Sequence, residues 1–161
     1  MRVHKHVCPK PNVGDEINDW FWFETIGKEL KRVRPDELLV GIGTVLSNKL
    51  PNGTKKYVLG SGTGYNNDEF KLLPEEYEVY FVRGPLTAAK LNLPESKWIT
   101  DPGVLISELR PITGPRDIPV SFMPHVGIDS EDYRKIVDEL GLNCISPSDD
   151  EDSMFVQIAR N

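Results

Sequence analysis

Short apolar runs alternate with amphipathic stretches along the chain, about every twenty to twenty-five residues. The runs are rich in residues that favour strands, and a helical pattern follows most of them. This alternation is typical of βαβ units, so it predicts an α/β protein with a mostly parallel sheet. The expected strands lie at 2–8, 37–42, 56–60, 78–82, 97–100, 119–123 and 143–146.

The stretches between these runs predict helices whose ends carry recognisable signals. Pro85 and Pro102 stand where a first helical residue is expected. Ser148 and Glu151 form an S-x-x-E pattern, which predicts a capping box at the start of the last helix. The expected helices lie at 15–31, 85–92, 102–109, 130–140 and 149–160, and the fourth carries an apolar stripe of Tyr133, Ile136, Val137 and Leu140.

Four consecutive aromatic residues, 20–23, lie in the first predicted helix. Because consecutive helical residues point all round the helix axis, they cannot share one buried face. We expect most of them in the core and one or two at an interface with a further chain or domain.

Composition and charge narrow the class of protein. With 161 residues, 39% hydrophobic and 27% charged, the chain has the size and composition of one soluble domain. No apolar run approaches the ~20 residues of a membrane span, and the start lacks a secretory signal, so a cytoplasmic protein is expected. The net charge of −6 argues against a nucleic-acid partner. Cys8 and Cys144 are expected to be small buried residues, with a chance disulfide as the alternative.

The loops that leave the carboxyl ends of parallel strands meet along one edge of a sheet, where ligands bind. In this chain those connectors are rich in glycine, and three of them open helices. Glycines allow close backbone approach, and helix starts offer free N–H groups, so the edge favours an anion. The connectors are 12–18, 41–44, 60–66, 83–87, 100–103 and 124–127.

Three side chains at these connectors could carry chemistry. Arg83 offers a planar fork of donors that suits a carboxylate or a phosphate, although a structural ion pair with Asp101 or Asp15 explains it equally well. Asp15 could act as a base or simply complement a helix dipole. His125 is an acid–base candidate or a structural imidazole.

Other motif readings are weaker. The segment 60-GSGTGY-65 is G-x-G-x-G and follows the third strand, so it gives little support for a dinucleotide site. His4, His6 and Cys8 alternate on one predicted strand, but no fourth ligand is spaced to complete a metal site. We therefore expect neither a metal nor a cofactor.

Six short segments, taken in order, resemble the polysaccharide pyruvyl transferase family. They are N-x-G-D-E-x-N at 12–18, G-I-G-T-V-L at 41–46, G-S-G at 60–62, V-R-G-P-L-T at 82–87, T-D-P-G-V-L at 100–105 and P-H at 124–125. The resemblance implies a Rossmann-like, doubly wound domain over residues 1–161. That domain would be the amino-terminal half of a two-domain enzyme like those of the glycosyltransferase B fold.

The resemblance also implies a reaction, in which phosphoenolpyruvate gives its pyruvate to a pair of sugar hydroxyls as a ketal during exopolysaccharide biosynthesis. It assigns roles by matched position. For the donor these are Arg83, Gly84, Gly62 and Ser61; for the glycan acceptor Asn12, Gly14 and Asp101; and for catalysis Asp15 and His125.

Two departures from the family pattern leave alternatives open. The family's G-D-P is Thr100-Asp101-Pro102 in this chain, and the later S-x-L-H-G-like segment with the expected general acid is not among these residues. The chain is therefore expected to need a carboxyl-terminal half or a second copy, or to be a one-domain relative that binds a sugar or anion without turnover. A third alternative is an interaction protein that docks through the aromatic residues 20–23.

Overall fold

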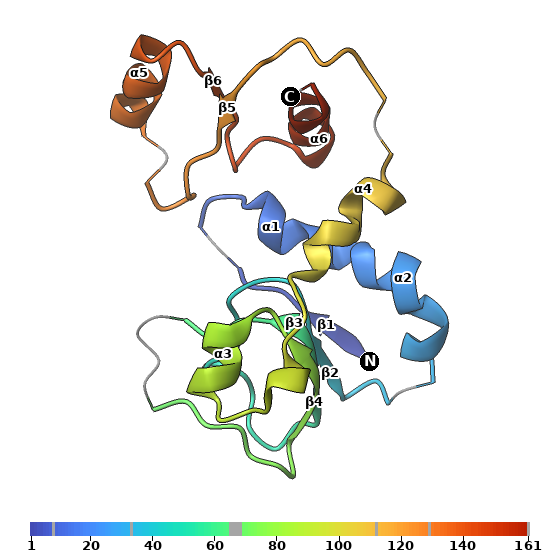
Figure 1. Ribbon diagram of the computed structural model, residues 1–161. Coiled ribbons are helices and arrows are strands. Elements are labelled where there is room, and N and C mark those ends of the chain that lie inside the picture. The colour runs from blue at the N-terminus through green and yellow to red at the C-terminus, as the bar shows by residue number, and fades with distance from the viewer. Residues whose placement is uncertain (8, 33, 65–68, 112, 129, 161) are drawn as a thin grey trace. The chain divides into compact units, whose positions relative to one another are not determined.

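The computed structural model describes residues 1–7, 9–32, 34–64, 69–111, 113–128 and 130–160. The chain divides into two compact units (Figure 1). Unit 1 comprises Met1–His6 and Ile17–Leu109, and unit 2 comprises Val7–Glu16 and Arg110–Asn161. Each unit contains its own parallel sheet, whereas the sequence pattern predicts one sheet for all strands.

Unit 1 is built on a four-stranded, all-parallel sheet whose spatial order is β1-β2-β3-β4. The strands are β1 (Arg2–His4), β2 (Leu38–Val40), β3 (Lys56–Ser61) and β4 (Tyr77–Val82). The predicted α/β class with a parallel, Rossmann-like sheet and flanking helices is confirmed. Spatial order equals chain order in these four described strands, so the connectors at their carboxyl ends follow one another along the sheet.

Alternate strand residues point to opposite sides of the sheet, and β2 is buried at all three of its residues. Val40, Val58 and Val82 are fully buried in a cluster with Ala88 of helix α3 (Pro85–Lys90). Leu39 is equally buried and belongs to the other face of the sheet. Helix α2 (Phe21–Leu30) lies on the side of the strands opposite α3 (Figure 1). Helices therefore flank both faces of the sheet.

The predicted first helix, 15–31, is divided into three short pieces. They are helix α1 (Val13–Glu16), the 3₁₀ helix η1 (Ile17–Asp19) and α2, which has non-helical backbone angles at Ile26. Asn18 lies at the break, where its side chain bonds to the backbone of Ile42 as well as to the Trp22 indole. The expectation of one continuous helix is therefore wrong.

The aromatic run 20–23 is mostly core. Phe21 and Trp22 are 1% and 3% exposed, whereas Phe23 is 55% exposed. Trp22 packs against Gly41, where an added Cβ would come within 2.4 Å of the indole ring. Because Phe21 and Trp22 are buried, Phe23 is the exposed phenylalanine of the run. A docking surface could therefore use only a small part of the aromatic run 20–23.

The segment after α3 is mostly helical. The predicted strand 97–100 reduces to one parallel bridge between Trp98 and Val82, because the 3₁₀ helix η2 (Glu95–Lys97) precedes it and Pro102 lacks a backbone N–H. The predicted helix 102–109 begins as a 3₁₀ turn, η3 (Pro102–Leu105), and continues as α4 (Ile106–Leu109).

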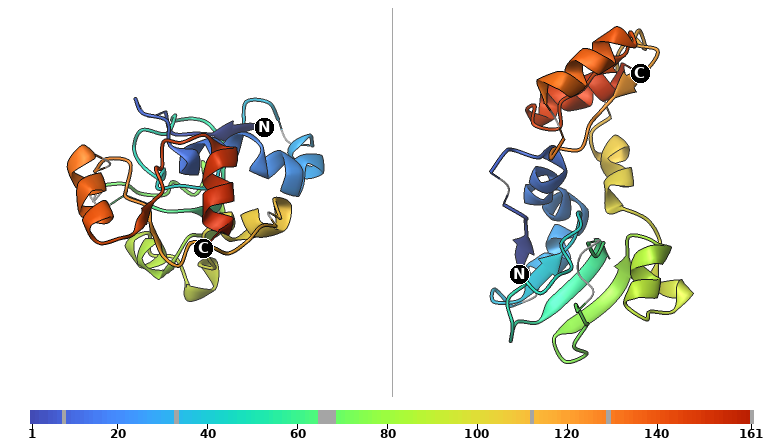
Figure 2. Two further views of the ribbon diagram at one scale, coloured as in Figure 1. Left: turned by 90° about the horizontal axis from the view of Figure 1, so that it is seen from above. Right: turned by 90° about the vertical axis from the view of Figure 1, so that its left-hand side faces the viewer.

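Unit 2 contains a small βαβ arrangement. Strands β5 (Ser121–Phe122) and β6 (Asn143–Cys144) pair in parallel, and helix α5 (Glu131–Glu139) connects them. Helix α6 (Glu151–Ala159) follows β6, and α5 and α6 lie on opposite sides of the two strands (Figures 1 and 2).

One expectation about the helices of unit 2 is wrong, and the predicted apolar stripe of α5 is mostly exposed. Asp150, not Ser148, caps α6, because the Asp150 carboxylate accepts a bond of 3.0 Å from the backbone N–H of Ser153. The apolar stripe of α5 is buried only at Val137; its other members are exposed, at 40% for Tyr133, 52% for Ile136 and 67% for Leu140. A two-stranded sheet is too narrow to cover the whole stripe.

Two further predictions concern a membrane span and the cysteines. Among the described residues, no helix combines the length and apolar character that crossing a bilayer requires. Cys8 lies outside the described residues. The predicted alternative of a disulfide between Cys8 and Cys144, and the set of His4, His6 and Cys8, therefore also fall outside them.

Candidate functional site

Four of the predicted connectors belong to unit 1 and meet at the carboxyl ends of β2, β3 and β4. We call this region the carboxyl edge; it comprises residues 41–46, 60–64, 83–87 and 100–103. Backbone bonds join the connectors, from Gly62 N–H to the Gly43 carbonyl at 2.9 Å and from Leu46 N–H to the Gly62 carbonyl at 3.1 Å. Residues 65 and 66 of the third connector lie outside the described residues. The described part of the edge is therefore a framework fixed by backbone bonds.

Arg83 stands at the centre of the carboxyl edge. Its Nη2 donates a hydrogen bond of 2.8 Å to Thr44 Oγ1, and its Nη1 lies 3.8 Å from an oxygen of Asp101. The side chain is 36% exposed. The ion pair that the sequence offered as the structural alternative is thus present, but at 3.8 Å it is too long for a hydrogen bond. A guanidinium has five N–H donors, so donors remain for a ligand.

The guanidinium lies directly against Gly62. A Cβ added at this glycine would come within 2.5 Å of Arg83 Nη2, so only glycine leaves the arginine in its present place. Gly84 has open space around it, with no atom within 4 Å of an added Cβ. Both glycines flank Arg83, and their role with the donor stays a prediction.

The polar residues beside Arg83 hold the connectors in place. Ser61 is fully buried, and its hydroxyl donates to the Gly43 carbonyl at 3.1 Å. Asp101 caps η3, because its Oδ1 accepts a bond of 2.9 Å from Gly103 N–H. The donor role predicted for Ser61 and the acceptor role predicted for Asp101 stay predictions, and both residues have a structural task besides.

Two threonines at the carboxyl edge were missed in the sequence. Thr44 positions the Arg83 guanidinium, as described above. Thr63 Oγ1 is buried and has no hydrogen-bond partner among the described residues. Such a hydroxyl is unusual in a folded protein and indicates a place where a ligand atom could bind. No sequence signal distinguishes these two threonines from others in loops.

Asn18 is the last residue of the motif at 12–18, and the motif does not reveal its structural importance. It is 1% exposed, and it bonds to Ile42 through both atoms of its amide group, at 3.0 and 3.1 Å. Its Oδ1 also accepts a bond of 2.9 Å from the Trp22 indole. The i,i+4 spacing of Asn18 and Trp22 was the available signal. Asn18 therefore fixes the second connector to the helix that covers the sheet.

The remaining predicted site residues belong to unit 2. Asn12 Nδ2 donates to Asp15 Oδ2 at 2.7 Å, and the backbone carbonyl of Asn12 accepts the N–H groups of Asp15 and Glu16 at the start of α1. Asp15 is 8% exposed. At Gly14 an added Cβ would lie 3.6 Å from the Asn12 side chain, an ordinary contact. These contacts bring the predicted acceptor and base residues of the first connector together.

His125 lies in a turn of unit 2 with its ring exposed. Its Nδ1 accepts a bond of 3.0 Å from Gly127 N–H, so in the neutral ring the proton belongs on Nε2. The catalytic role of His125 stays a prediction. Arg83 belongs to unit 1 and His125 to unit 2, so the shared rim of six connectors stays a prediction.

Among the residues that the structure describes, no group of three or more His, Cys, Asp or Glu side chains is arranged to hold a metal ion. The carboxyl edge instead offers a guanidinium, backbone N–H groups and hydroxyls. This donor set suits an anion that carries carboxylate or phosphate oxygens.

Comparison with known proteins gives one informative relative. The chain is 37% identical over 157 residues to the succinoglycan biosynthesis protein ExoV of Rhizobium meliloti (strain 1021). The match covers 93% of this chain and 48% of ExoV, so the chain spans about half the length of that curated protein. No family model and no solved structure matches the chain. The similarity supports, at the level of the family, the resemblance carried by the motifs.

Proposed function

We propose that this chain belongs to the polysaccharide pyruvyl transferase family and forms the amino-terminal part of an enzyme. The enzyme would transfer pyruvate from phosphoenolpyruvate to two hydroxyls of a sugar, as a cyclic ketal. The relative is a succinoglycan biosynthesis protein, which supports a role in exopolysaccharide biosynthesis. We place that role in the cytoplasm, where phosphoenolpyruvate is made.

The chemistry requires groups that bind anions and groups that move protons. A first sugar hydroxyl adds to C2 of phosphoenolpyruvate while C3 takes up a proton and becomes a methyl group. A second hydroxyl then adds to C2, the bond between C2 and the phosphate oxygen breaks, and the second proton leaves with the phosphate. The donor brings a carboxylate and a phosphate, so a cation must hold it and stabilise the leaving group.

One observation carries the proposal: the Arg83 guanidinium is fixed at the carboxyl edge, over Gly62 and beside Thr44. Arginine binds carboxylate or phosphate through two parallel bonds, which a lysine cannot match. Gly62 and Gly84 would let the donor approach the backbone, and the Thr63 hydroxyl, which has no partner in the described part of the chain, would bond to a donor oxygen. Ser61 would keep this part of the loop in place.

We assign the acceptor and proton-transfer roles to the connectors at 12–15, 100–103 and 124–127. Asn12, Gly14 and Asp101 would hold the sugar hydroxyls. Asp15 would take the proton of the attacking hydroxyl, because a carboxylate is a suitable general base at neutral pH. His125 would assist proton transfer through Nε2, whose orientation is set by the bond from Gly127 to Nδ1. A carboxyl-terminal half, or a second copy of the chain, would supply the remaining general acid.

Transfer activity tests this proposal directly. The chain, alone and with the carboxyl-terminal half of a relative supplied, is incubated with phosphoenolpyruvate and a β-linked hexose acceptor. We expect release of phosphate that depends on the acceptor, together with a pyruvate ketal detected by mass spectrometry. Arg83→Ala should abolish both signals.

The matched control is Lys55→Ala. Lys55 is 33% exposed and pairs with Glu78 at 3.9 Å, which closely resembles the exposure and ion pair of Arg83, but it lies next to the amino end of β3. This variant should retain the activity. Binding of phosphoenolpyruvate without turnover in either preparation would contradict the enzyme and favour the alternative of an anion-binding module.

A further inference from the structure

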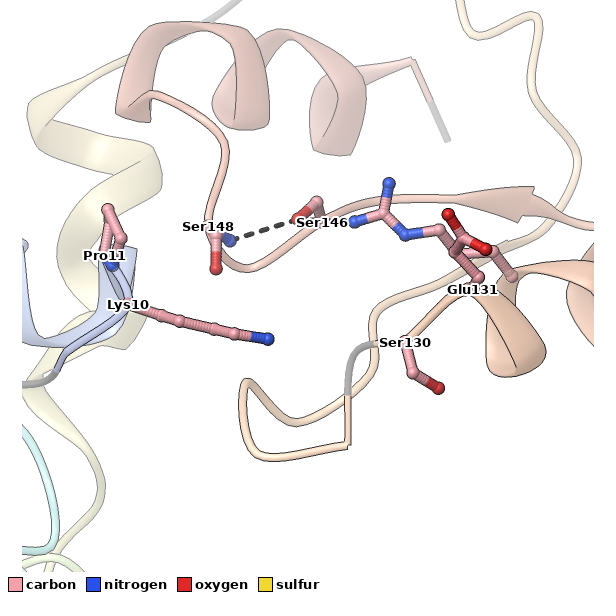
Figure 3. A pocket seen from close by; sticks show the side chains of 7 residues that line it. Lys10, Pro11, Ser130, Glu131, Ser146 and Ser148 are labelled. Atoms are coloured by element: carbon pink, nitrogen blue, oxygen red, sulfur yellow. Dashed lines mark hydrogen bonds between the residues drawn. The ribbon is translucent and has the colours of Figure 1, made fainter.

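Unit 2 contains a pocket of about 360 Å³ that the proposed transfer reaction does not use. The residues around it come from the loop before α1, the start of α5 and the loop before α6 (Figure 3). They are Lys10, Pro11, Ser130, Glu131, Arg134, Ser146 and Ser148. All of them belong to unit 2, so the pocket is a feature of that unit alone.

Two cations and several hydroxyls line this pocket. The Lys10 side chain extends into the space between the loop of Ser148 and the loop of Ser130 (Figure 3). Arg134 Nη2 bonds to Ser146 Oγ at 3.3 Å, which directs the guanidinium toward the loop before α6. Lys10 and Arg134 against Glu131 give the lining one net positive charge. The pocket therefore favours an anionic group.

A hydroxyl without a partner lies at the wall. Ser148 Oγ is withdrawn from solvent and has no hydrogen-bond partner among the described residues. The backbone N–H of Ser148 bonds to Ser146 Oγ at 3.3 Å, so the loop itself is held in place while the hydroxyl is not used. A buried hydroxyl without a partner costs free energy, and a ligand oxygen would remove that cost.

The lining also distinguishes a sugar phosphate from a simple anion. Glu131 is an acceptor-only group, so it repels a bare phosphate but can accept hydrogen bonds from sugar hydroxyls. A volume of about 360 Å³ lies within the range of small-molecule sites and exceeds that of a phosphate ion. Cations at one place and a carboxylate at another therefore match a ligand with both an anionic and a polyhydroxyl part.

We propose that this pocket binds the phosphate monoester of a sugar, with Arg134 and Lys10 on the phosphate and Glu131 on the sugar hydroxyls. The Ser148 hydroxyl donates to a phosphate oxygen. The lining residues of the pocket belong to unit 2, whereas Arg83 belongs to unit 1, and the proposal does not depend on the transfer reaction.

Calorimetric titrations of the whole chain with glucose 1-phosphate, orthophosphate and glucose test the proposal. Glucose 1-phosphate should bind at least about tenfold more tightly than orthophosphate, and glucose alone should give no measurable heat. Equal affinity for orthophosphate, or binding of glucose alone, would overturn the assignment of a sugar phosphate.

Substitutions locate the binding. Arg134→Ala should weaken glucose 1-phosphate binding about tenfold or more, the loss expected for a hydrogen bond to a charged group. Lys135→Ala is the matched control, because Lys135 lies on the same helix, is 71% exposed and is not part of the pocket lining. Affinity in that variant should change less than about twofold. Equal weakening in both variants would show a diffuse charge effect and overturn the site.

Two further variants keep the test decisive if Arg134→Ala does not fold. Ser148→Ala removes only the unpartnered hydroxyl, so the chain should fold normally and bind glucose 1-phosphate about three- to tenfold more weakly. Glu131→Gln should bind orthophosphate more tightly and lose part of the preference for the sugar phosphate. Arg83→Ala should leave glucose 1-phosphate binding unchanged, which separates this site from the proposed donor site. Unchanged affinity in both Ser148→Ala and Glu131→Gln would contradict the proposal.

Discussion

We propose an anionic ligand for both the carboxyl edge of unit 1 and the pocket of unit 2, but the two regions are built differently. Arg83 lies on a framework of backbone bonds between connectors of a four-stranded sheet, beside strands whose core residues are fully buried. Lys10 and Arg134 come from a loop and a helix around two strands of two residues each. The first site is therefore fixed by the fold, and the second depends on local side-chain contacts.

This difference predicts where substitutions should lower the stability of the fold. At the carboxyl edge, Gly60 and Gly62 leave no room for a side chain and Ser61 is fully buried, so changes at these residues should cost stability. In unit 2, turns and caps are more open, and the same kinds of change should cost less. Three of the following comparisons pair a position in unit 1 with a similar position in unit 2, and one compares two positions within unit 2.

The largest effect is expected at glycines with positive φ. Gly60 in β3 has φ +80°, and an added Cβ would lie 2.2 Å from the Pro102 ring. Gly60→Ala should lower the free energy of unfolding by about 2–5 kcal/mol, from the left-handed backbone and the overpacking together. Gly141 in unit 2 has φ +68° and open space around it, so Gly141→Ala should cost only about 1–2 kcal/mol. Equal losses in urea denaturation would contradict the contrast.

The second comparison concerns two asparagines. Asn18→Ala removes a fully buried amide and leaves the Ile42 backbone and the Trp22 indole without partners. We expect a loss of about 2–4 kcal/mol in the free energy of unfolding. Asn143→Ala in unit 2 removes one bond of 3.0 Å to the partly exposed Ser121 hydroxyl and should cost under about 1 kcal/mol. Chemical denaturation of both variants, with Asn18→Asp as a near-isosteric check, measures the difference.

The third comparison lies within unit 2 and tests the start of α6. Asp150→Ala should lower the free energy of unfolding by about 1 kcal/mol, because it removes the carboxylate that caps the helix. Ser148→Ala should leave stability within about 0.5 kcal/mol of the original chain, since its hydroxyl bonds to no described residue. The reverse order in thermal melts would restore the capping box expected from the sequence.

The smallest expected effect is the loss of folding stability at acidic pH. A hydrogen bond from the Lys56 ammonium, and then one from Gly53 N–H, hold the pKa of Glu76 below its ordinary value of 4.5. In unit 2 the guanidinium of Arg160 lowers the pKa of Asp117 in the same way. A lowered pKa in the folded state gives stability that is present above the unfolded pKa and is lost as pH falls through the folded value. Glu76 should therefore lose its contribution as the pH falls below 4.5, and Asp117 as the pH falls below 3.8.

Glu76→Gln should remove more of this acid dependence than Asp117→Asn, because Lys56 is fully buried whereas Arg160 is 42% exposed. Unfolding free energies measured between pH 3 and pH 7 test this order. Adding about 1 M salt should reduce the contribution of Asp117 more than that of Glu76. If Asp117→Asn removed more of the acid dependence than Glu76→Gln, the predicted order would be wrong.

Periodicity was sufficient to predict the α/β class and the strands of unit 1, because each strand is a compact apolar run with its own turn signals. It did not predict that residues 15–31 break at Asn18 or that the sheets are separate. The break comes from bonds to Ile42, which is distant in the sequence. The shift of the α6 cap from Ser148 to Asp150 has a similar cause, because both residues are good caps and local sequence does not decide between them.

The candidate site was predictable only where backbone position determines it. Residues at the ends of parallel strands must meet, so Arg83, Gly62 and Asp101 were expected together and lie together. The sequence did not predict a role for Thr44 or Thr63, since a threonine in a loop carries no distinctive signal. The pocket around Lys10 and Arg134 was also missed, because its residues are far apart in sequence and belong to no motif.

The most direct test of the central claim, that Arg83 holds the donor anion, is the affinity for phosphoenolpyruvate measured by calorimetry in the original chain and in two variants. We predict that Arg83→Ala loses about 1.5–3 kcal/mol of binding free energy, as loss of a charge-assisted bond requires, while Lys55→Ala binds as the original chain does. Equal affinity in Arg83→Ala and the original chain would contradict the account.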